Sequence, residues 1–418
     1  MTFNPAAIRR QFPLLTSGSF AYLDSAASAQ KPQAVLDAMD RFYREDNANV
    51  HRGMHVLAEQ ATTAYEDARS TVSRFIGADA HEIIFTKNCT EAINLVAGSW
   101  GKANLKTGDS VALSILEHHS NIVPWLQRKE ESGVEVLWFD IHDDGTVNME
   151  ELRSLLARGH VKLVAITGLS NVLGTKPSLQ EMIALAHAAG AKVLVDAAQL
   201  IAHERIDVRA LDCDFLAFSG HKLYGPTGIG VLYGKQQLLN DMPPFLGGGM
   251  MIGTVHKDRF TCAQPPAKFE AGTPPIAEAV GLAAAIDWLS QFDWEEISRH
   301  EASLMHHAID ELTTIEGLRI LAYLPAGQAG PLSTIHYPLR SGCLSFTIEG
   351  IHPHDLTDII GTQGICLRAG HHCTQPLHKR LGVGASTRLS VGIYNMDEDI
   401  DRTVEAIRKA QRTLRPHL

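Results

Sequence analysis

The 418-residue sequence lacks an excess of basic residues, a long apolar run and any closely spaced cysteine pair. Lysine and arginine number 37 against 47 aspartates and glutamates, which gives a net charge of −10. A chain of this sign offers no basic surface for nucleic acid or an anionic membrane. Its longest apolar stretch, AVGLAAAIDWL, is interrupted by Asp287, well short of the ~18 residues that a membrane-spanning helix needs. We therefore expect small molecules or proteins as partners.

The first residues, MTFNPAAIRRQF, lack the apolar core of a secretion signal. The six cysteines are spread along the chain without a CxxC pair, at Cys89, Cys213, Cys262, Cys343, Cys366 and Cys373. Scattered cysteines in a long chain are typical of free thiols in a reducing compartment. The sequence thus predicts a soluble, cytoplasmic protein.

Apolar strand-like runs alternate with amphipathic helical stretches through the first two thirds of the chain, which predicts a mostly parallel sheet. The expected strands are 110–115, 134–139, 161–167, 191–196, 214–219 and 228–233. The clearest helix between them, SLQEMIALAHAAG, ends at Gly190. After a glycine- and proline-rich passage at 243–275, helices at 277–292 and 295–315 precede short strands, and a helix at 397–414 ends the pattern. We expect a large α/β domain followed by a smaller α+β domain.

Polar residues gather at the ends of these strands, where open α/β sheets bind ligands. Asp196 ends one strand in VLVDAAQ and Gln199 follows three residues later, although a carboxylate at such a place is usually a helix cap or a loop contact. Lys222 follows the next strand in FSGHKLYGPTGIG. This stretch matches neither GxxxxGK(S/T) nor GxGxxG, the two glycine motifs of nucleotide-binding proteins. A buried amine needs a partner or a covalent attachment, whereas an exposed lysine in a glycine-rich turn needs neither.

Two further clusters allow two interpretations each. Thr90, in TKNCTEAINLVA, either caps a helix or helps its first turn bind phosphate. His118 belongs to a histidine pair in LEHHSNIVPW, which lacks further ligands at metal-binding spacing, so stacking on a flat cofactor is the alternative. Together the clusters supply what pyridoxal phosphate requires: Asp196 for the pyridinium nitrogen, Lys222 for a Schiff base, and a helix start with Ser219 and His221 for the phosphate.

The stretch LRAGHHCTQP places Cys373 beside Arg368, His371 and His372. Three adjacent residues make a poor zinc site, because zinc ligands on one arm are usually two to four residues apart. A structural cysteine would have apolar neighbours. Cationic neighbours instead favour the thiolate, so the pattern indicates a nucleophile.

The combination of AYLDSAASAQKP, VHRGMH, EHHSNIVPW, SNVLGT, LVDAAQ, DCDFLAFSGHKLYGPTGIG, FEAGTPPIAEA and RAGHHC resembles the SufS-type, group II cysteine desulfurases of the class V aminotransferase family. Some members of this group are also selenocysteine lyases. The resemblance runs from about Arg10 to the last helix. It implies the fold-type I architecture of pyridoxal phosphate enzymes: an N-terminal segment on the small domain (1–20), a large α/β domain with a seven-stranded, mostly parallel sheet (21–275), and a small α+β domain carrying the cysteine loop (276–418).

The resemblance also implies roles for individual residues. The catalytic residues would be Lys222, Cys373 and His118. Cofactor contacts would come from Cys89, Thr90, His118, Asn171, Asp196, Gln199, Ser219, His221, Lys222 and, from a second subunit, Thr273. The substrate would meet Arg388, Asn171, Arg368, His51 and Arg52, without a metal. One departure from the family pattern is Cys89, where threonine is common.

The function so implied is conversion of L-cysteine to L-alanine, with the sulfur held as a persulfide on Cys373. A SufE- or SufU-type protein would accept it for iron–sulfur cluster assembly, and L-selenocysteine is a second expected substrate. The family also implies a homodimer. Two alternatives stay open: another pyridoxal phosphate lyase or aminotransferase, from which only Cys373 separates this chain, and a sulfur-transfer scaffold without catalysis.

Overall fold

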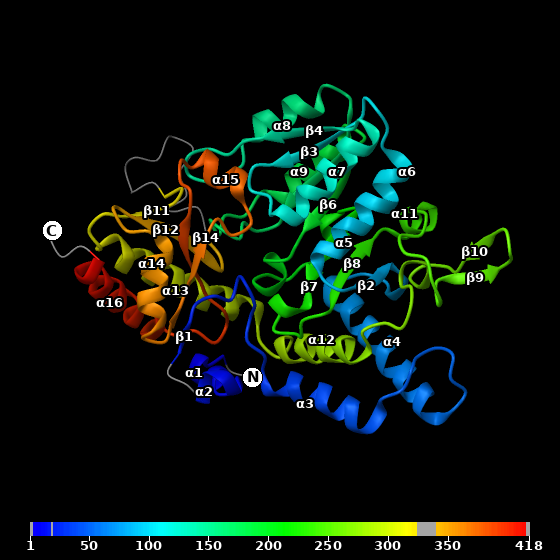
Figure 1. Ribbon diagram of the computed structural model, residues 1–418, viewed down its shortest axis with the longest axis horizontal. Helices are drawn as coiled ribbons and strands as arrows, with labels where there is room; N and C mark the ends of the chain where they lie inside the picture. Colours follow the sequence, from blue (N-terminus) through cyan, green and yellow to red (C-terminus); the bar gives the residue numbers. More distant parts are fainter. Residues whose placement is uncertain (1–2, 18–19, 324–339, 415–418) are drawn as a thin grey trace.

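The chain forms two lobes that lie side by side (Figure 1). The structure is a computed structural model that describes residues 3–17, 20–323 and 340–414. The larger lobe is built on a seven-stranded sheet with the order β2-β8-β7-β6-β5-β3-β4. These strands span, in that order, Ile83–Thr86, Gly230–Gly234, Phe215–Ser219, Lys192–Asp196, Val161–Thr167, Ser110–Ser114 and Glu135–Phe139. The fold class predicted from the sequence is confirmed.

All six predicted strands are present, and β2 is the strand that the prediction missed. The strands are parallel except β8, which runs antiparallel to both of its neighbours. Their residues are almost continuously apolar because helices cover both faces of the sheet. In β6, for example, Val193 and Val195 face one apolar core while Leu194 faces the other, as expected when successive side chains alternate across a strand.

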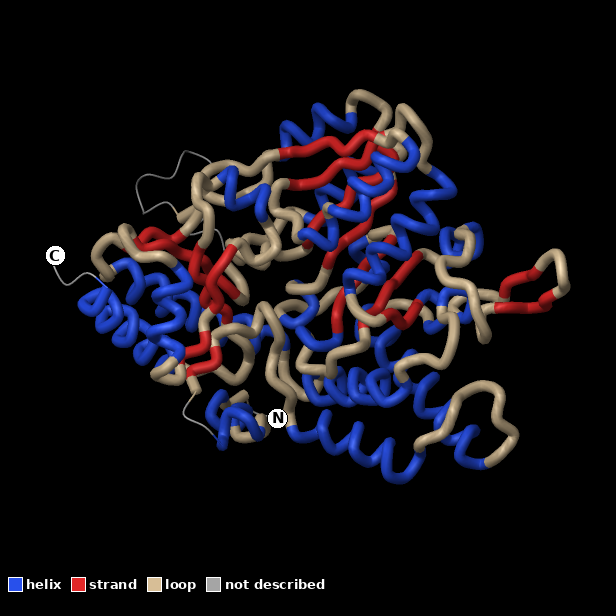
Figure 2. Tube along the Cα trace, viewed as in Figure 1, coloured by secondary structure: helices blue, strands red, loops and turns tan. Residues whose placement is uncertain are grey.

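Helices pack on the two faces of this sheet (Figure 2). One face is covered by side chains of α4 (Val56–Ile76), α8 (Met149–Leu156), α9 (Leu179–Ala188) and α12 (Ile276–Leu289). The other is covered by α5 (Cys89–Leu95) and α7 (Val123–Ser132). Smaller helices of this lobe are α3 (Gln33–Arg41), α6 (Lys102–Asn104), α10 (Val208–Leu211) and α11 (Gln236–Asp241).

The smaller lobe has an antiparallel sheet of β11 (Leu318–Ile320), β12 (Cys343–Ile348), β15 (Ser386–Ser390) and β14 (Arg368–Gly370), in that order. Apolar residues of α13 (Trp294–Thr313), α14 (Pro353–Gly361) and α16 (Asp397–Leu414) form a separate core against it. α15 (Gln375–Arg380) follows β14. The helices expected at 295–315 and 397–414 are therefore confirmed as α13 and α16.

The N-terminal segment reaches the small lobe through β1 (Ala21–Tyr22), which pairs with β13 (Ile365–Cys366). It begins with α1 (Pro5–Arg9) and α2 (Pro13–Ser17), and Arg9 forms an ion pair with Asp399 of α16. α12 lies just after the predicted boundary at 275/276 and contacts α3 and α4 of the large lobe. The division into folding units stays a prediction.

A hairpin of β9 (Ile252–Val255) and β10 (Phe260–Cys262) extends from the body of the large lobe (Figure 1). Its side chains Val255 and Phe260 are 62% and 56% exposed. The helices of the described residues include none that is both long and apolar enough to cross a membrane.

Candidate active site

A cavity of about 310 Å³ lies where the carboxyl ends of β5, β6 and β7 meet the small lobe. Carboxyl ends of parallel strands share one edge of a sheet, which brings distant residues together. Twelve of the predicted site residues line this cavity: Cys89, Thr90, His118, Asn171, Asp196, Gln199, Ser219, His221, Lys222, Arg368, Cys373 and Arg388. Three do not, namely His51, Arg52 and Thr273.

Asp196 is the buried last residue of β6. Its Oδ1 accepts hydrogen bonds from Ala198 N at 2.9 Å and from Cys89 Sγ at 3.4 Å. Burial raises the pKa of this carboxyl, whereas the Ala198 N–H and the nearby Lys222 amine act in the opposite direction. The contact with Cys89 identifies that thiol as a buried neighbour of the acid.

Lys222 ends a short turn, Gly220–Lys222, that follows β7. Burial lowers the pKa of its amine, while the charge of Asp196 acts to raise it. Among the described residues, no hydrogen bond to the Lys222 Nζ atom and no ion pair between it and Asp196 is formed. A basic and an acidic group therefore line the same cavity without forming an ion pair with each other.

The start of α5 forms another wall of the cavity. Asn88, not Thr90, is the N-cap, since its side chain accepts a hydrogen bond from Glu91 N at 2.9 Å. The cap suggested for Thr90 was thus wrong by two residues. Cys89 N donates to Ser219 Oγ at 2.8 Å, and Gly230 allows this approach because a Cβ there would lie 2.4 Å from Asn88 Cα.

His118 precedes a short turn, η4 (His119–Asn121), and its Nδ1 lies 2.8 Å from Ser120 Oγ. Burial, together with the Lys222 charge, lowers the pKa of His118 to about 3. The imidazole is therefore neutral at physiological pH. Gln199 is buried opposite the N-terminal segment and donates from Nε2 to the Ala26 carbonyl at 2.8 Å.

Two arginines enter from the small lobe, and they stand opposite each other on β14 and β15. Arg388 is buried and donates to the Asn171 carbonyl at 3.0 Å and to Asp24 Oδ1 at 3.2 Å. Arg368 binds both oxygens of Asp24, the shorter contact being 2.8 Å. The Nε atom of Arg388 is buried and has no hydrogen-bond partner among the residues that the structure describes. Asp24 thus links both arginines.

Cys373 lies in the loop between β14 and α15 and is exposed. Both Cys373 and His372 have left-handed backbone conformations, with φ of +58° and +48°, which are uncommon for residues other than glycine. The Asn171 side chain donates to the His372 carbonyl at 2.8 Å. Burial next to Arg388 lowers the pKa of His372 to about 2. Counting His372 as a cationic neighbour of the thiol was therefore wrong.

The three remaining predicted residues lie elsewhere in this chain. His51 is 3.5 Å from Glu66 and packs its ring against Tyr65. Arg52 is exposed beside it. Thr273 lines a smaller cavity of about 130 Å³, next to the start of α5 but outside the main cavity.

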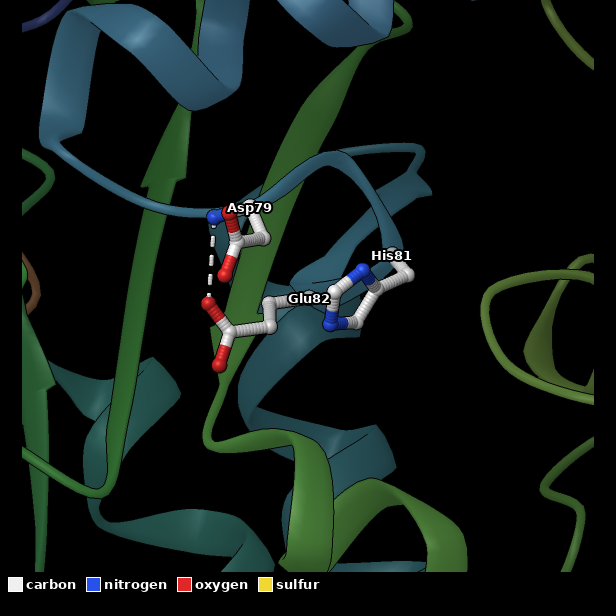
Figure 3. Close-up of side chains that lie close together, drawn as sticks. All are labelled: Asp79, His81 and Glu82. Carbon is white, nitrogen blue, oxygen red and sulfur yellow. Dashed lines mark hydrogen bonds between the residues drawn. The ribbon is translucent and has the colours of Figure 1, made fainter.

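Among the described residues, one further group has potential metal ligands close together: Asp79, His81 and Glu82, whose ligand atoms lie within 4.8 Å of one another (Figure 3). Glu82 accepts a hydrogen bond from Asp79 N, as the figure shows. The Arg209 guanidinium binds Asp79 at 2.6 Å and Glu82 at 2.7 Å. The Arg209 guanidinium thus already pairs with both carboxylates, so these three residues give no support for a metal site.

The residues of the main cavity fit pyridoxal phosphate. The unpaired amine of Lys222 and the buried carboxyl of Asp196 match the aldehyde and ring nitrogen of the cofactor. The start of α5, with Ser219 and His221, lines the part of the cavity that would take its phosphate. Arg388 keeps one buried donor available for a further anion.

Comparison with known proteins gives one family. Residues 21–403 match the profile described as Aminotransferase class-V. A cysteine desulfurase from Salmonella agona (strain SL483) is 46% identical over 420 residues, which cover 99% of this chain and 100% of the relative. The solved cysteine desulfurase CsdA from Escherichia coli has a TM-score of 0.90 and 40% identity over 99% of this chain and 100% of that one.

A cysteine desulfurase from Thermococcus onnurineus NA1 also has a TM-score of 0.90, at 36% identity and 97% coverage of both chains. These matches confirm the family resemblance, the fold-type I architecture and the cofactor that the sequence predicted. The chain belongs to the cysteine desulfurases of the class V aminotransferase family, which are pyridoxal phosphate enzymes.

Proposed function

We propose that this protein removes sulfur from L-cysteine, releases L-alanine and holds the sulfur as a persulfide on Cys373. The observation that carries the proposal is the position of Cys373 at the rim of the cavity that also contains Lys222, Asp196 and Arg388. An aminotransferase needs the amine, the acid and the arginine, but it has no use for a thiol there. The four residues together favour desulfuration.

The cofactor, when bound, supplies an electron-withdrawing ring that stabilises negative charge at the substrate Cα. Lys222 would hold its aldehyde, and Asp196 with Gln199 would hold the ring nitrogen and phenolic oxygen. Phosphate contacts would come from Thr90, Ser219 and His221, with the Cys89 backbone close by. A ring stacked on the neutral imidazole of His118 would complete the site.

The substrate carboxylate would bind the Arg388 guanidinium, with Asn171 and Arg368 beside it. Two parallel hydrogen bonds to a carboxylate suit a planar guanidinium. The lowered pKa of Lys222 favours an amine that can take the Cα proton. His118, neutral and lining the cavity, can accept or return a proton at the substrate. The roles expected for His51 and Arg52 stay predictions.

Cys373 Sγ, as thiolate, would then attack the substrate sulfur. The bond from sulfur to the substrate Cβ breaks and its electron pair stays with that carbon, which takes a proton returned by Lys222 or His118 and becomes the methyl group of alanine. Cys373 carries the sulfur as a persulfide. Only four residues separate Arg368 from Cys373, so the thiol cannot travel far. A dedicated acceptor of the SufE or SufU type must therefore come to it, and we place its use in cytoplasmic iron–sulfur cluster assembly.

Replacement of Cys373 by alanine tests the reaction class. The C373A enzyme should keep the visible absorbance of the bound cofactor and lose alanine formation from cysteine. Alanine formation at the wild-type rate would refute desulfuration through this thiol and favour another lyase or an aminotransferase. Comparing selenocysteine with cysteine in the same variant tests the selenocysteine lyase activity, which needs no thiol attack.

A wild-type protein that binds no cofactor would favour the non-catalytic scaffold.

A homodimer completes the proposed site. Thr273 lies outside its own chain's main cavity, so its expected phosphate contact requires a second copy. The β9–β10 hairpin extends from the body and exposes Val255 and Phe260, and exposed apolar groups of this kind favour a protein interface. Light scattering should give twice the chain mass of 45.6 kDa. A monomer would refute this part of the proposal.

A further inference from the structure

The second histidine of the EHH motif, His119, contacts the loop of Cys373 in two places. Its backbone N–H donates to the Cys373 carbonyl at 2.8 Å. Its side-chain Nε2 accepts a hydrogen bond from Gln375 N at 3.2 Å. The short turn η4 of the large lobe thus holds the peptide groups on both sides of Thr374, in the small lobe.

The loop needs such contacts because its backbone is strained. His372 and Cys373 both have positive φ, and neither is a glycine. Backbone conformations of this kind persist only where the surroundings impose them, and they gather at functional sites. The loop's own contacts, from Thr374 N and Thr374 Oγ1 to the His371 carbonyl, both at 2.8 Å, lie within the turn. Among the described residues of the large lobe, Asn171 holds the His372 carbonyl and His119 provides the other hydrogen bonds to this loop.

The geometry fixes the protonation state of the His119 side chain. Nε2 can accept from Gln375 N only when it carries no proton, so the imidazole is neutral with its hydrogen on Nδ1. Burial and the neighbouring His371 lower the pKa of His119, which supports the same state. A glutamine at this position would offer a carbonyl oxygen at a similar reach, whereas alanine would offer no acceptor.

We infer that His119 is a positioning residue for sulfur transfer: its ring Nε2 and its backbone N–H together hold the Cys373 loop so that the thiol borders the cavity. The consequence for sulfur transfer rests on the proposed function, whereas the restraint of the loop by His119 does not. It assigns His119 no contact with the cofactor. Loss of the ring contact should therefore slow the attack of Cys373 while leaving cysteine binding intact.

The test compares the His119→Ala and His119→Gln holoenzymes with the wild type. One lost hydrogen bond of about 1.4 kcal/mol corresponds to a tenfold change. H119A should therefore form the Cys373 persulfide about tenfold more slowly in a single turnover, with the KM for cysteine within about twofold of wild type. H119Q should restore the rate. A normal rate in H119A, a slow H119Q, or a KM raised as much as the rate falls would overturn the inference.

Amide hydrogen exchange tests the structural part without any turnover. The peptide containing residues 371–375 should exchange faster in H119A, by about tenfold at the Gln375 amide, and should return toward wild-type protection in H119Q. Unchanged exchange in H119A would overturn the inference. A wild-type enzyme that forms no persulfide would refute the proposed function instead, and the exchange result would still decide whether His119 restrains the loop.

Discussion

Replacing Arg388 by lysine tests how the substrate carboxylate is held. The guanidinium is fixed on one side by the Asn171 carbonyl at 3.0 Å and on another by Asp24 at 3.2 Å. Its buried Nε has no partner within the described part of the chain, so the group is oriented and still has a donor to offer. Lysine keeps the positive charge but loses the planar pair of donors. The substitution thus separates geometry from charge.

The size of the effect follows from the number of hydrogen bonds lost. Lysine can make one charged contact with the carboxylate where arginine makes two, and a hydrogen bond to a charged group contributes about 1.5–3 kcal/mol. With tenfold for each ~1.4 kcal/mol, the KM for cysteine should rise about 10- to 150-fold. Asp24 still has Arg368 as a partner in the variant, so the local ion pair is not lost altogether.

The assay is alanine production at varied cysteine concentration. Arg340→Lys is a matched control, because Arg340 is also buried, bonds among the described residues to the carbonyls of Leu173, Leu321 and Ala322, and is not one of the described residues that line the cavity. R340K should lower the unfolding temperature without changing KM. If R388K leaves KM within about twofold of wild type while its fold is intact, Arg388 does not hold the substrate carboxylate.

Three further predictions concern the buried groups. Lys222→Ala should abolish the borohydride-fixed cofactor on peptide mapping, and a labelled peptide without Lys222 would contradict the assignment. Iodoacetamide should alkylate Cys373 in the native protein but not Cys89, since burial and the neighbouring Asp196 raise the pKa of the Cys89 thiol; equal labelling would contradict its buried position. Burial acts to lower the pKa of His203, but Glu301 at 2.7 Å reverses this and the net pKa is raised. The stabilisation by this pair is therefore complete below the usual histidine pKa and is lost as the pH rises through the raised pKa of His203. Between pH 6 and pH 9 the urea midpoint of unfolding should fall by more in the wild type than in His203→Gln.

The sequence predicted the central sheet well because its strands are buried on both faces and read as apolar runs bounded by turns. β2 was missed because it is only four residues long and is preceded by a short turn rather than a glycine or proline signal. The positions of Asp196 and Lys222 were predictable for a related reason. Asp196 ends β6 and Lys222 ends the short turn after β7, and the carboxyl ends of parallel strands lie at one edge of a sheet.

Contacts that depend on the docking of the two lobes were not predictable in this way. Asp24 joins Arg368 and Arg388 across more than 340 residues of sequence, and no local pattern encodes such a pairing. The charge of His372 was misjudged because its burial beside Arg388 is set by the loop conformation. Asp24 belongs to the motif AYLDSAASAQKP, which is part of the family resemblance. Its spacing in the sequence did not indicate that it would pair with the two arginines.

The most direct test of the central claim, that a thiol borders the cavity shared by Lys222 and Asp196, is to locate the persulfide by mass. The holoenzyme is given one equivalent of cysteine, alkylated and digested, and every cysteine peptide is weighed. We predict one added sulfur on the peptide containing Cys373, formed together with one alanine per chain. Alanine release with no added sulfur on that peptide, or sulfur on another cysteine, would contradict it.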